Sequence, residues 1–268
     1  MPKNRQDEFT AEVFGVMAGA GHAFLPAKLL DAMRKRDRVT TWDAACPTIW
    51  IGCDPPCHDR AAMGLSAFVV DRRSGLIVVI GLAAVEAQAT EVHQIQMVVG
   101  HWVSELRKHP FVAADSCFVP IVECNNNDIL SKSIVTAIGA AGRNRMYMPF
   151  VNRRFKKYVS DGVGVWTTQE TTLAALSVTY QALIDGRISI ADEIVVTNRE
   201  IIDARAKKPT QEELVERLAG ELGQFGYNSA GKVTGKCSED ALDDLGMAFL
   251  LSMYWRVAVK QADPSVSD

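Results

Sequence analysis

The chain has 268 residues, of which 48% are hydrophobic and 23% are charged, and its formal net charge is −3. This length and composition are ordinary for a globular protein and allow one large domain or two small ones. The weak negative charge excludes a globally basic surface, so any region that binds nucleic acid must be local.

The sequence lacks the features of secreted and membrane-spanning proteins. No apolar run reaches the roughly 18 residues of a membrane span, and the polar start MPKNRQDEFTAEVFG is not a signal peptide. Six cysteines are too few for a disulfide scaffold, so reduced thiols are expected. We therefore expect a protein that is not secreted, has no membrane partner and stays in the compartment where it is made.

Three regions are expected along the chain. Residues 1–45 are predicted to form an N-terminal helical and linker segment, because Phe9 and Val13 belong to a set of apolar residues at helical spacing. Residues 46–260 hold the periodic apolar segments of one folded domain. Residues 261–268 are polar and are expected to form a flexible tail.

The first half of the folded region is predicted to be rich in strands. A buried strand is expected over residues 48–54. Two longer apolar runs, MGLSAFVVDRR and GLIVVIGLAAVEA, flank a turn at residues 73–75 and predict an antiparallel hairpin. A helix is expected over 90–108, and then a short strand over 117–124 in which Pro120 indicates an edge or a bulge.

Helices predominate in the second half. Periodicity predicts helices over 128–142, 168–184 and 210–222, and an apolar final helix over 239–258 that should be buried. Short strands are expected at RMYMPF and within ISIADEIVV. Three adjacent strands suited to antiparallel pairing, followed by alternating helices and strands, predict an α/β protein. Its mixed sheet, antiparallel first and then parallel, should carry helices on both faces, as in the RNase H-like fold.

Four acidic residues stand where these elements end or begin. Asp54 ends the first strand, Glu123 ends the fourth, and Asp243 and Asp244 lie in the first turns of the final helix. In the predicted fold the first and fourth strands are parallel neighbours, so their carboxyl ends lie side by side near the start of that helix. Like charges this close repel, and a hard divalent cation, Mg²⁺ or Mn²⁺, relieves the repulsion. Two such ions can activate a water and stabilise the leaving oxygen of a phosphodiester.

Each of these acids also has an ordinary structural interpretation. Asp54 before two prolines is typical of a turn, and Glu123 before CNNND is typical of a cap for the next helix. Acids at the start of a helix complement its dipole. Cys53, Cys57 and His58 are an alternative zinc set, although no second paired cluster occurs at ligand spacing.

Several motifs, taken in order, resemble the nuclease domain of the large terminase subunit of herpesviruses and tailed phages. They are IGCDPP with Gly64 after it, VECNNND, GVWTTQETTLAAL before a helix ending in DGR, and TGKCSEDALDDLGMAFLLSMYW. They span residues 50–255, and the herpesvirus type is the more similar. The resemblance implies an RNase H-like nuclease domain over residues 46–260.

The resemblance further implies a two-metal endonuclease that cuts concatemeric double-stranded viral DNA. Its ligands to two Mg²⁺ or Mn²⁺ ions would be Asp54, Glu123, Asp243 and Asp244, with Asp240 as a further candidate. The implied partners are DNA, the ATPase portion of the terminase, and other packaging subunits or the portal. The implied location is the host nucleus for a herpesvirus-like protein and the host cytoplasm for a phage-like one.

Two departures from the family pattern limit these implications. No G-x-x-x-x-G-K-[ST] motif occurs, so we expect an excised domain, a fragment or a separate subunit rather than a packaging ATPase. Thr171 and Thr172 stand where relatives often carry a basic residue, which weakens the expectation of DNA contact from that segment.

Local basic clusters are the candidates for DNA contact. One lies in a loop interleaved with aromatic residues, and the other is a pair of lysines in the Gly-rich segment before the double aspartate. A solvated loop with its aromatic residues in the core is the alternative. The basic residues are Arg153, Arg154, Lys156, Lys157, Lys232 and Lys236.

Two other functions are consistent with the same sequence. One is another RNase H-like nuclease, such as a junction resolvase or a hybrid-specific ribonuclease. The other is a non-catalytic packaging assembly module that keeps the fold and docks other subunits. Substrate preference separates the first from a packaging nuclease, and metal binding separates the second.

Overall fold

A computed structural model describes residues 23–42, 48–56, 62–86, 91–125, 128–143, 145–147, 164–197, 208–227, 232–235 and 243–262. The strands are β1 (Thr48–Asp54), β2 (Ala62–Val70), β3 (Ile77–Glu86), β4 (Cys117–Val122), β5 (Arg145–Met146), β6 (Ile188–Val196), β7 (Gly226–Tyr227) and β8 (Val233–Thr234). The helices are α2 (Ala27–Lys35), α3 (Val92–Leu106), α4 (Asp128–Gly142), α5 (Gln169–Ile184), α6 (Gln211–Gln224) and α7 (Asp244–Ala262).

A six-stranded mixed sheet in the order β5-β4-β1-β2-β3-β6 forms the centre of the molecule. The strands β1, β2 and β3 pair antiparallel, whereas β4 is parallel to β1, β5 to β4 and β6 to β3. The predicted α/β class, with three antiparallel strands and then parallel ones, is therefore confirmed. The segment ISIADEIVV becomes one strand, β6, at the edge of this sheet beside β3.

The predicted hairpin between β2 and β3 turns through Asp71–Leu76. The Asp71 carboxylate accepts hydrogen bonds from the backbone N–H of Arg73 at 3.0 Å and from the Ser74 hydroxyl at 2.5 Å. Gly75 has φ of +70°, a conformation that side chains disfavour. This local polar chemistry fixes the register with which the two apolar strands return on each other.

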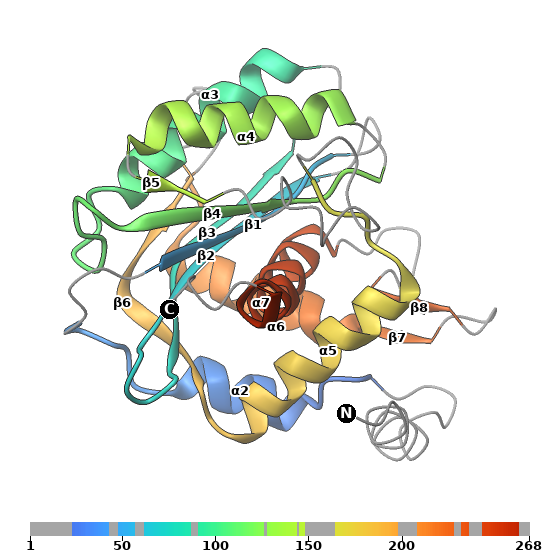
Figure 1. The fold of residues 1–268 in the computed structure, drawn as a ribbon. Helices are drawn as coiled ribbons and strands as arrows, with labels where there is room; N and C mark the ends of the chain where they lie inside the picture. The colour runs from blue at the N-terminus through green and yellow to red at the C-terminus, as the bar shows by residue number, and fades with distance from the viewer. Residues whose placement is uncertain are drawn as a thin grey trace.

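Helices cover both faces of the sheet, as the sequence predicts (Figure 1). The helices α3 and α4 lie together on one face, and α7 crosses the other face against β1 and β2. The helices α5 and α6 pack on α7, and α2 packs on α6. As expected for a helix that is apolar nearly all round, α7 buries large side chains such as Phe249, Met253 and Trp255.

Pro120 lies on the outer part of β4, as predicted for a residue without a backbone N–H. The pairing of β5 with β4 involves only Cys117 and Phe118, whereas β1 pairs with β4 along its whole length, including Pro120 with Ile51. The register with β1 runs without a break, so the bulge interpretation is wrong for this pairing, and the edge strand on this side of the sheet is β5 rather than β4.

Element boundaries differ from the predictions mainly at α7. This helix begins at Asp244, later than the residue 239 predicted from the sequence. The predicted N-terminal helix around Phe9 and Val13 lies outside the described residues. None of the helices in the described ranges is long and apolar enough to cross a membrane.

Candidate metal centre at the carboxyl ends of β1 and β4

Asp54 and Glu123 lie side by side because β1 and β4 are parallel neighbours. Their register pairs Cys53 with Val122, so the next residue of each strand reaches the same edge of the sheet. The backbone N–H of Glu123 continues the ladder by donating to the carbonyl of Cys53 at 3.0 Å. The two side chains hydrogen bond directly to each other. The strand therefore ends on an acid that meets a second acid.

This arrangement raises the pKa of Asp54 well above its usual range. Burial of the carboxyl group by surrounding protein atoms is the largest cause, although part of the residue still contacts solvent. The negative charge of Glu123 and the hydrogen bond to it follow, and then the charges of Asp244 and Asp243. Without a cation, a hydrogen bond between two carboxyl groups requires that they share a proton.

Two glycines bring the start of α7 onto this edge of the sheet. Gly64 pairs with Asp54 across β1 and β2, and a Cβ atom at Gly64 would lie 2.1 Å from the carbonyl oxygen of Asp244. A Cβ atom at Gly52 would lie 1.9 Å from the carbonyl oxygen of Ala248, one turn further along. Only residues without side chains allow the helix backbone to approach this closely. Asp243 and Asp244 are 7% and 4% exposed.

The four acids provide the oxygen donors that Mg²⁺ and Mn²⁺ prefer, from three segments far apart in the chain. As they stand, no three His, Cys, Asp or Glu side chains of the described residues are grouped closely enough to hold an ion. The carboxyl groups of Asp54 and Glu123 hydrogen bond to each other, and a cation would have to replace this bond before both could turn toward one ion. The donor set thus fits a hard cation, with side-chain rearrangement on binding.

The alternative zinc set receives no support from Cys53. Its side chain is fully buried, and burial, followed by the charges of Asp54 and Glu123, raises the pKa of the thiol well above its usual value. Zinc ligation needs a thiolate, which this environment disfavours. Cys57 and His58 lie outside the described residues.

A segment outside the predicted ligand set lies directly beside Glu123. Val165 forms a parallel bridge with Glu123, and the Val165 carbonyl accepts from the Cys124 N–H at 2.9 Å. The Asn125 amide then clamps the backbone of Thr167, donating to its carbonyl at 2.7 Å and accepting from its N–H at 2.8 Å. Between these two fixed points stands Trp166, with half of its surface exposed.

The double threonine of the next helix has a structural role. Thr168 and Thr171 form a capping box at the start of α5, and the Thr172 hydroxyl donates to the Thr168 carbonyl at 2.9 Å. Thr171 and Thr172 are 3% and 7% exposed. Both side chains are therefore occupied in the start of α5 and are not on the surface.

Most of the predicted DNA-binding residues lie outside the described residues. Lys232 is exposed at the start of β8, and Gly235 just beyond it lies against the Asp243 side chain, since a Cβ atom there would be 2.7 Å from Oδ2. The predicted residues that lie outside the described part of the chain are Arg153, Arg154, Lys156, Lys157, Lys236 and the additional acid Asp240.

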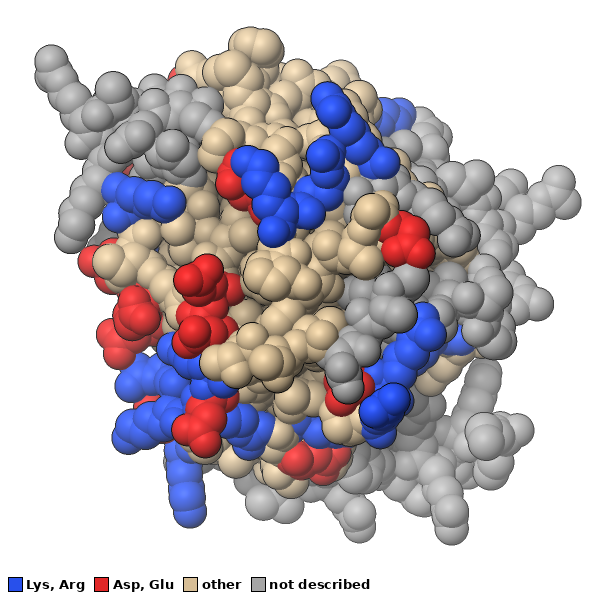
Figure 2. Space-filling model, turned by 90° about the vertical axis from the view of Figure 1, so that its left-hand side faces the viewer, with Lys and Arg blue, Asp and Glu red and all other residues tan. Residues whose placement is uncertain are grey.

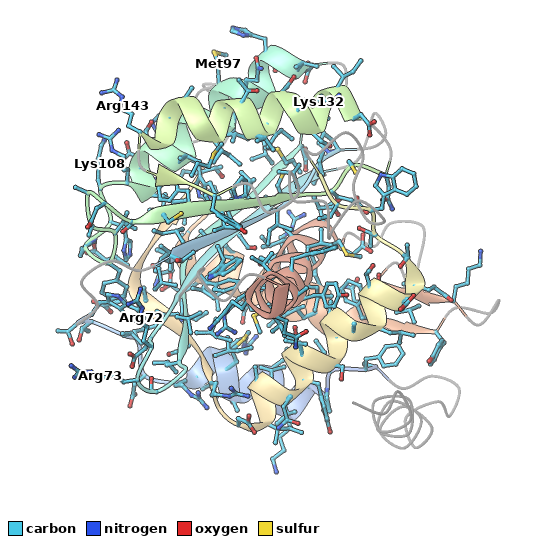
Figure 3. The ribbon with its side chains drawn as sticks, in the orientation of Figure 1. Arg72, Arg73, Met97, Lys108, Lys132 and Arg143 are labelled. Atoms are coloured by element: carbon cyan, nitrogen blue, oxygen red, sulfur yellow. The ribbon has the colours of Figure 1, made fainter. Side chains whose placement is uncertain are left out.

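Other basic side chains gather at the opposite end of the sheet. Figure 3 shows Arg72, Arg73, Lys108 and Arg143 along one edge of the molecule, whereas Lys132 lies toward the other end of α4. The 15 residues of α4 separate its two ends by about 22 Å. Figure 2 shows the face with these residues, where basic and acidic side chains are intermixed. This face does not extend the candidate metal centre.

Comparison with known proteins identifies solved structures that have the same fold. No family model and no curated protein matches the sequence. Among solved structures, the human cytomegalovirus terminase nuclease domain superposes with a TM-score of 0.61 at 16% identity, covering 86% of this chain and 94% of that one. The chain has the fold of a terminase nuclease domain.

Further solved structures agree with this assignment. The manganese-soaked, inhibitor-bound form of the cytomegalovirus domain gives a TM-score of 0.62 at 14% identity over 87% of this chain and 94% of that one. The large terminase nuclease domain of P22 gives 0.50 at 10% identity over 90% and 94%. These neighbours are RNase H-like, so the predicted fold and the stated resemblance are both confirmed at the level of fold.

Proposed function

We propose that this chain is a metal-dependent DNA endonuclease of a viral genome-packaging terminase, which cuts concatemeric double-stranded DNA. The observation that carries the proposal is the meeting of Asp54 and Glu123 at the sheet edge, with Asp243 and Asp244 brought to them by α7. The same fold in the nuclease domains of cytomegalovirus and P22 terminases supports it.

The ligands to the cations would be Asp54, Glu123 and the pair Asp243 and Asp244. When bound, two Mg²⁺ or Mn²⁺ ions would lower the pKa of a water nucleophile and stabilise the leaving oxygen of the phosphodiester. The cytomegalovirus domain was soaked with manganese, which supports a divalent ion in this fold. The protein's own part is to supply anionic oxygens held in place on rigid strand ends.

The proposed partners follow from this role. They are double-stranded DNA, the ATPase portion of the terminase, and other packaging subunits or the portal. A herpesvirus-like protein would act in the host nucleus and a phage-like one in the host cytoplasm. We propose that basic side chains flank the metal centre and hold the phosphate backbone, and the candidates are Lys232 and the basic residues from Arg153 to Lys157.

Plasmid cleavage tests the proposal. With Mn²⁺ or Mg²⁺ the purified chain should nick and linearise supercoiled DNA with little sequence preference, and EDTA should stop the reaction. Four-way junctions and RNA–DNA hybrids of equal length serve as competing substrates. A strong preference for either one would favour a junction resolvase or a hybrid ribonuclease, and absence of metal binding by calorimetry would favour a non-catalytic assembly module.

Trp166 is proposed to contact the DNA next to the cleaved phosphate. Neighbouring strands lie about 4.8 Å apart and consecutive Cα atoms 3.8 Å, so the Cα atoms of Trp166 and Glu123 lie within about 9 Å. Trp166→Ala should weaken binding of a fluorescent duplex in EDTA by about tenfold, because burial of the exposed half of its ring against the DNA is worth roughly 1–2 kcal/mol. Ile184→Ala is the matched control, since Ile184 is equally exposed at the far end of α5. Equal duplex affinities for the two variants would exclude this contact.

A further inference from the structure

The first turn of α7 has an unusual capping arrangement. The backbone N–H of Met247 donates to the carbonyl of Asp243 at 2.7 Å, which makes Asp243 the N-cap residue. Asp244, Leu245 and Gly246 are then the first three residues of the helix. An aspartate at an N-cap ordinarily accepts a hydrogen bond with its own carboxylate from the second or third of these backbone N–H groups.

In this protein Glu221 of α6 binds those N–H groups. Its Oε2 atom accepts from the Gly246 N–H at 2.8 Å, and the Leu245 N–H also donates to its carboxylate. The other oxygen, Oε1, accepts from Nε of Arg217 at 2.6 Å. Glu221 is only 4% exposed, so the interaction is sheltered from water. A carboxylate from another helix therefore stands where the side chain of Asp243 would cap its own helix.

The approach of the two helices is built for this contact. A Cβ atom at Gly246 would lie 3.1 Å from the Cβ of Glu221 and 3.3 Å from the ring of Phe225, so a side chain there would crowd α6. Burial raises the pKa of Glu221, and the bonds from Arg217 and the helix N–H groups counter that rise. Arg217 Nε and the positive end of the α7 dipole thus provide compensation for a buried carboxylate.

We propose that Glu221 is a positioning residue that caps α7 in place of Asp243, so that the Asp243 carboxylate serves the metal centre. This inference rests on the proposed function, because it assigns Asp243 to the cations. The physical reason is competition: one carboxylate cannot satisfy the helix N–H groups and coordinate a cation with the same oxygens. A second acid from α6 removes the competition and fixes the orientation of the turn that carries Asp243 and Asp244.

A double-mutant cycle without metal or DNA tests the capping exchange. In the Glu221→Ala background, Asp243 should turn back to cap α7, so Asp243→Ala should lower Tm there by about 2–4 °C more than it does in the native background. Thermal unfolding in EDTA measures all four proteins. Equal Tm changes for Asp243→Ala in both backgrounds would show that the two carboxylates do not exchange this role.

Manganese binding tests the consequence for the metal centre. Glu221→Ala should weaken Mn²⁺ affinity in calorimetry by about 10- to 100-fold, the usual effect of losing a residue that orients a metal ligand. Glu221→Gln keeps an acceptor oxygen and should remain within a few-fold of the native affinity. Thr210→Ala removes the N-cap of α6 at its other end and controls for lost stability. It should leave the affinity unchanged.

A purely structural role for Glu221 predicts a different pattern. Glu221→Ala would then lower Tm as Thr210→Ala does while binding Mn²⁺ as tightly as the native chain, and the inference would be wrong. If Glu221→Ala fails to fold, Glu221→Asp replaces it, because a shorter acid keeps its charge but does not reach the Gly246 N–H. It should weaken Mn²⁺ binding as the alanine variant does, and native affinity would contradict the inference.

The test of the role of Glu221 can fail or succeed independently of the test of nuclease activity. A native chain that binds Mn²⁺ but does not cut DNA would refute the nuclease, while the double-mutant cycle and the Mn²⁺ affinities would still support or overturn the role of Glu221. A native chain that binds no Mn²⁺ would overturn both the metal centre and this role.

Discussion

Asp54→Asn should raise the Tm of the metal-free protein at neutral pH while reducing DNA cleavage by on the order of 10³-fold. Stability should rise because the substitution removes a carboxyl group whose ionisation is opposed by burial and by the charges of Glu123, Asp244 and Asp243. A gain of at least about 1 kcal/mol corresponds to roughly 2–4 °C for a chain of this size. Cleavage should fall because the amide no longer supplies an anionic oxygen to the cations, which are worth several kcal/mol in the transition state.

The pH dependence of this effect has a definite sign. The folded chain keeps a proton on Asp54 above the ordinary pKa near 3.8, at which the unfolded chain releases it. The Asp54 contribution to stability is therefore lost progressively as pH rises from about 4 through the raised pKa. The Tm difference between Asp54→Asn and the native chain should be small below pH 4 and should grow above it. Mn²⁺ should reverse the order by stabilising only the native chain.

Asp71→Asn is the matched control for this experiment. Asp71 ends no ligand-bearing strand, and the hydroxyl of Ser74, followed by the N–H of Arg73, lowers its pKa. The sign is opposite: the Asp71 contribution to stability is present above its ordinary pKa, and removal of the charge should not raise Tm. Cleavage should stay at the native level. If the Tm of Asp54→Asn in EDTA at pH 7 is equal to or below that of the native chain, the proximity of Asp54 to the other acids does not cost stability, and the prediction is wrong.

Gly64→Ala should both destabilise the fold and abolish cleavage. The added Cβ would lie 2.1 Å from the Asp244 carbonyl oxygen, 2.3 Å from its carbon and 2.6 Å from the Leu245 nitrogen. All three are backbone atoms, so the first turn of α7 must move away from β2. Such overpacking costs typically about 1–3 kcal/mol and at times more. Asp243 and Asp244 move with that turn, so metal affinity and cleavage should be lost together.

Two other glycines turn this prediction into a graded test. Gly52→Ala meets the Ala248 carbonyl at 1.9 Å, one turn beyond the acids, and should cost at least as much stability. Gly220→Ala, on the surface of α6, meets nothing within 4 Å and should stabilise by about 0.5–1 kcal/mol through helix propensity. Denaturant unfolding and plasmid cleavage measure both properties. Native Mn²⁺ affinity in Gly64→Ala would show that α7 does not position the site.

The predictions from sequence succeeded where a pattern reports local burial or a local turn. The hairpin of β2 and β3, the buried strand β1 and the apolar helix α7 each follow from apolar periodicity and turn chemistry. The start of α7 was misplaced because acids at a helix start complement the dipole over several residues and mark no single position. The strand β6 was difficult to assign because the exposed acids Asp192 and Glu193 interrupt its apolar pattern in the middle.

In the candidate site, too, the features that follow from local patterns were predictable and those that depend on long-range contacts were not. That Asp54 and Glu123 end parallel strands could be inferred from their positions after apolar runs, together with a fold whose first and fourth strands are neighbours. The hydrogen bonds of Asn125 to the backbone of Thr167 could not be inferred from the sequence. The two residues are 42 positions apart, and neither belongs to a periodic pattern. The cap by Glu221 was equally hidden, since a glutamate within a charged helix is normally exposed.

Apolar spacing and turn residues act through the local backbone, so they are enough to predict the elements, the mixed sheet and the acids that end its strands. The tertiary structure decided how close α7 lies to β1 and β2, which carboxylate caps it, and which exposed aromatic residue stands beside Glu123. These features depend on contacts between segments distant in the chain. At these contacts the geometry is fixed by the absence of a Cβ atom, as at Gly64, or by the reach of one side chain, as at Glu221.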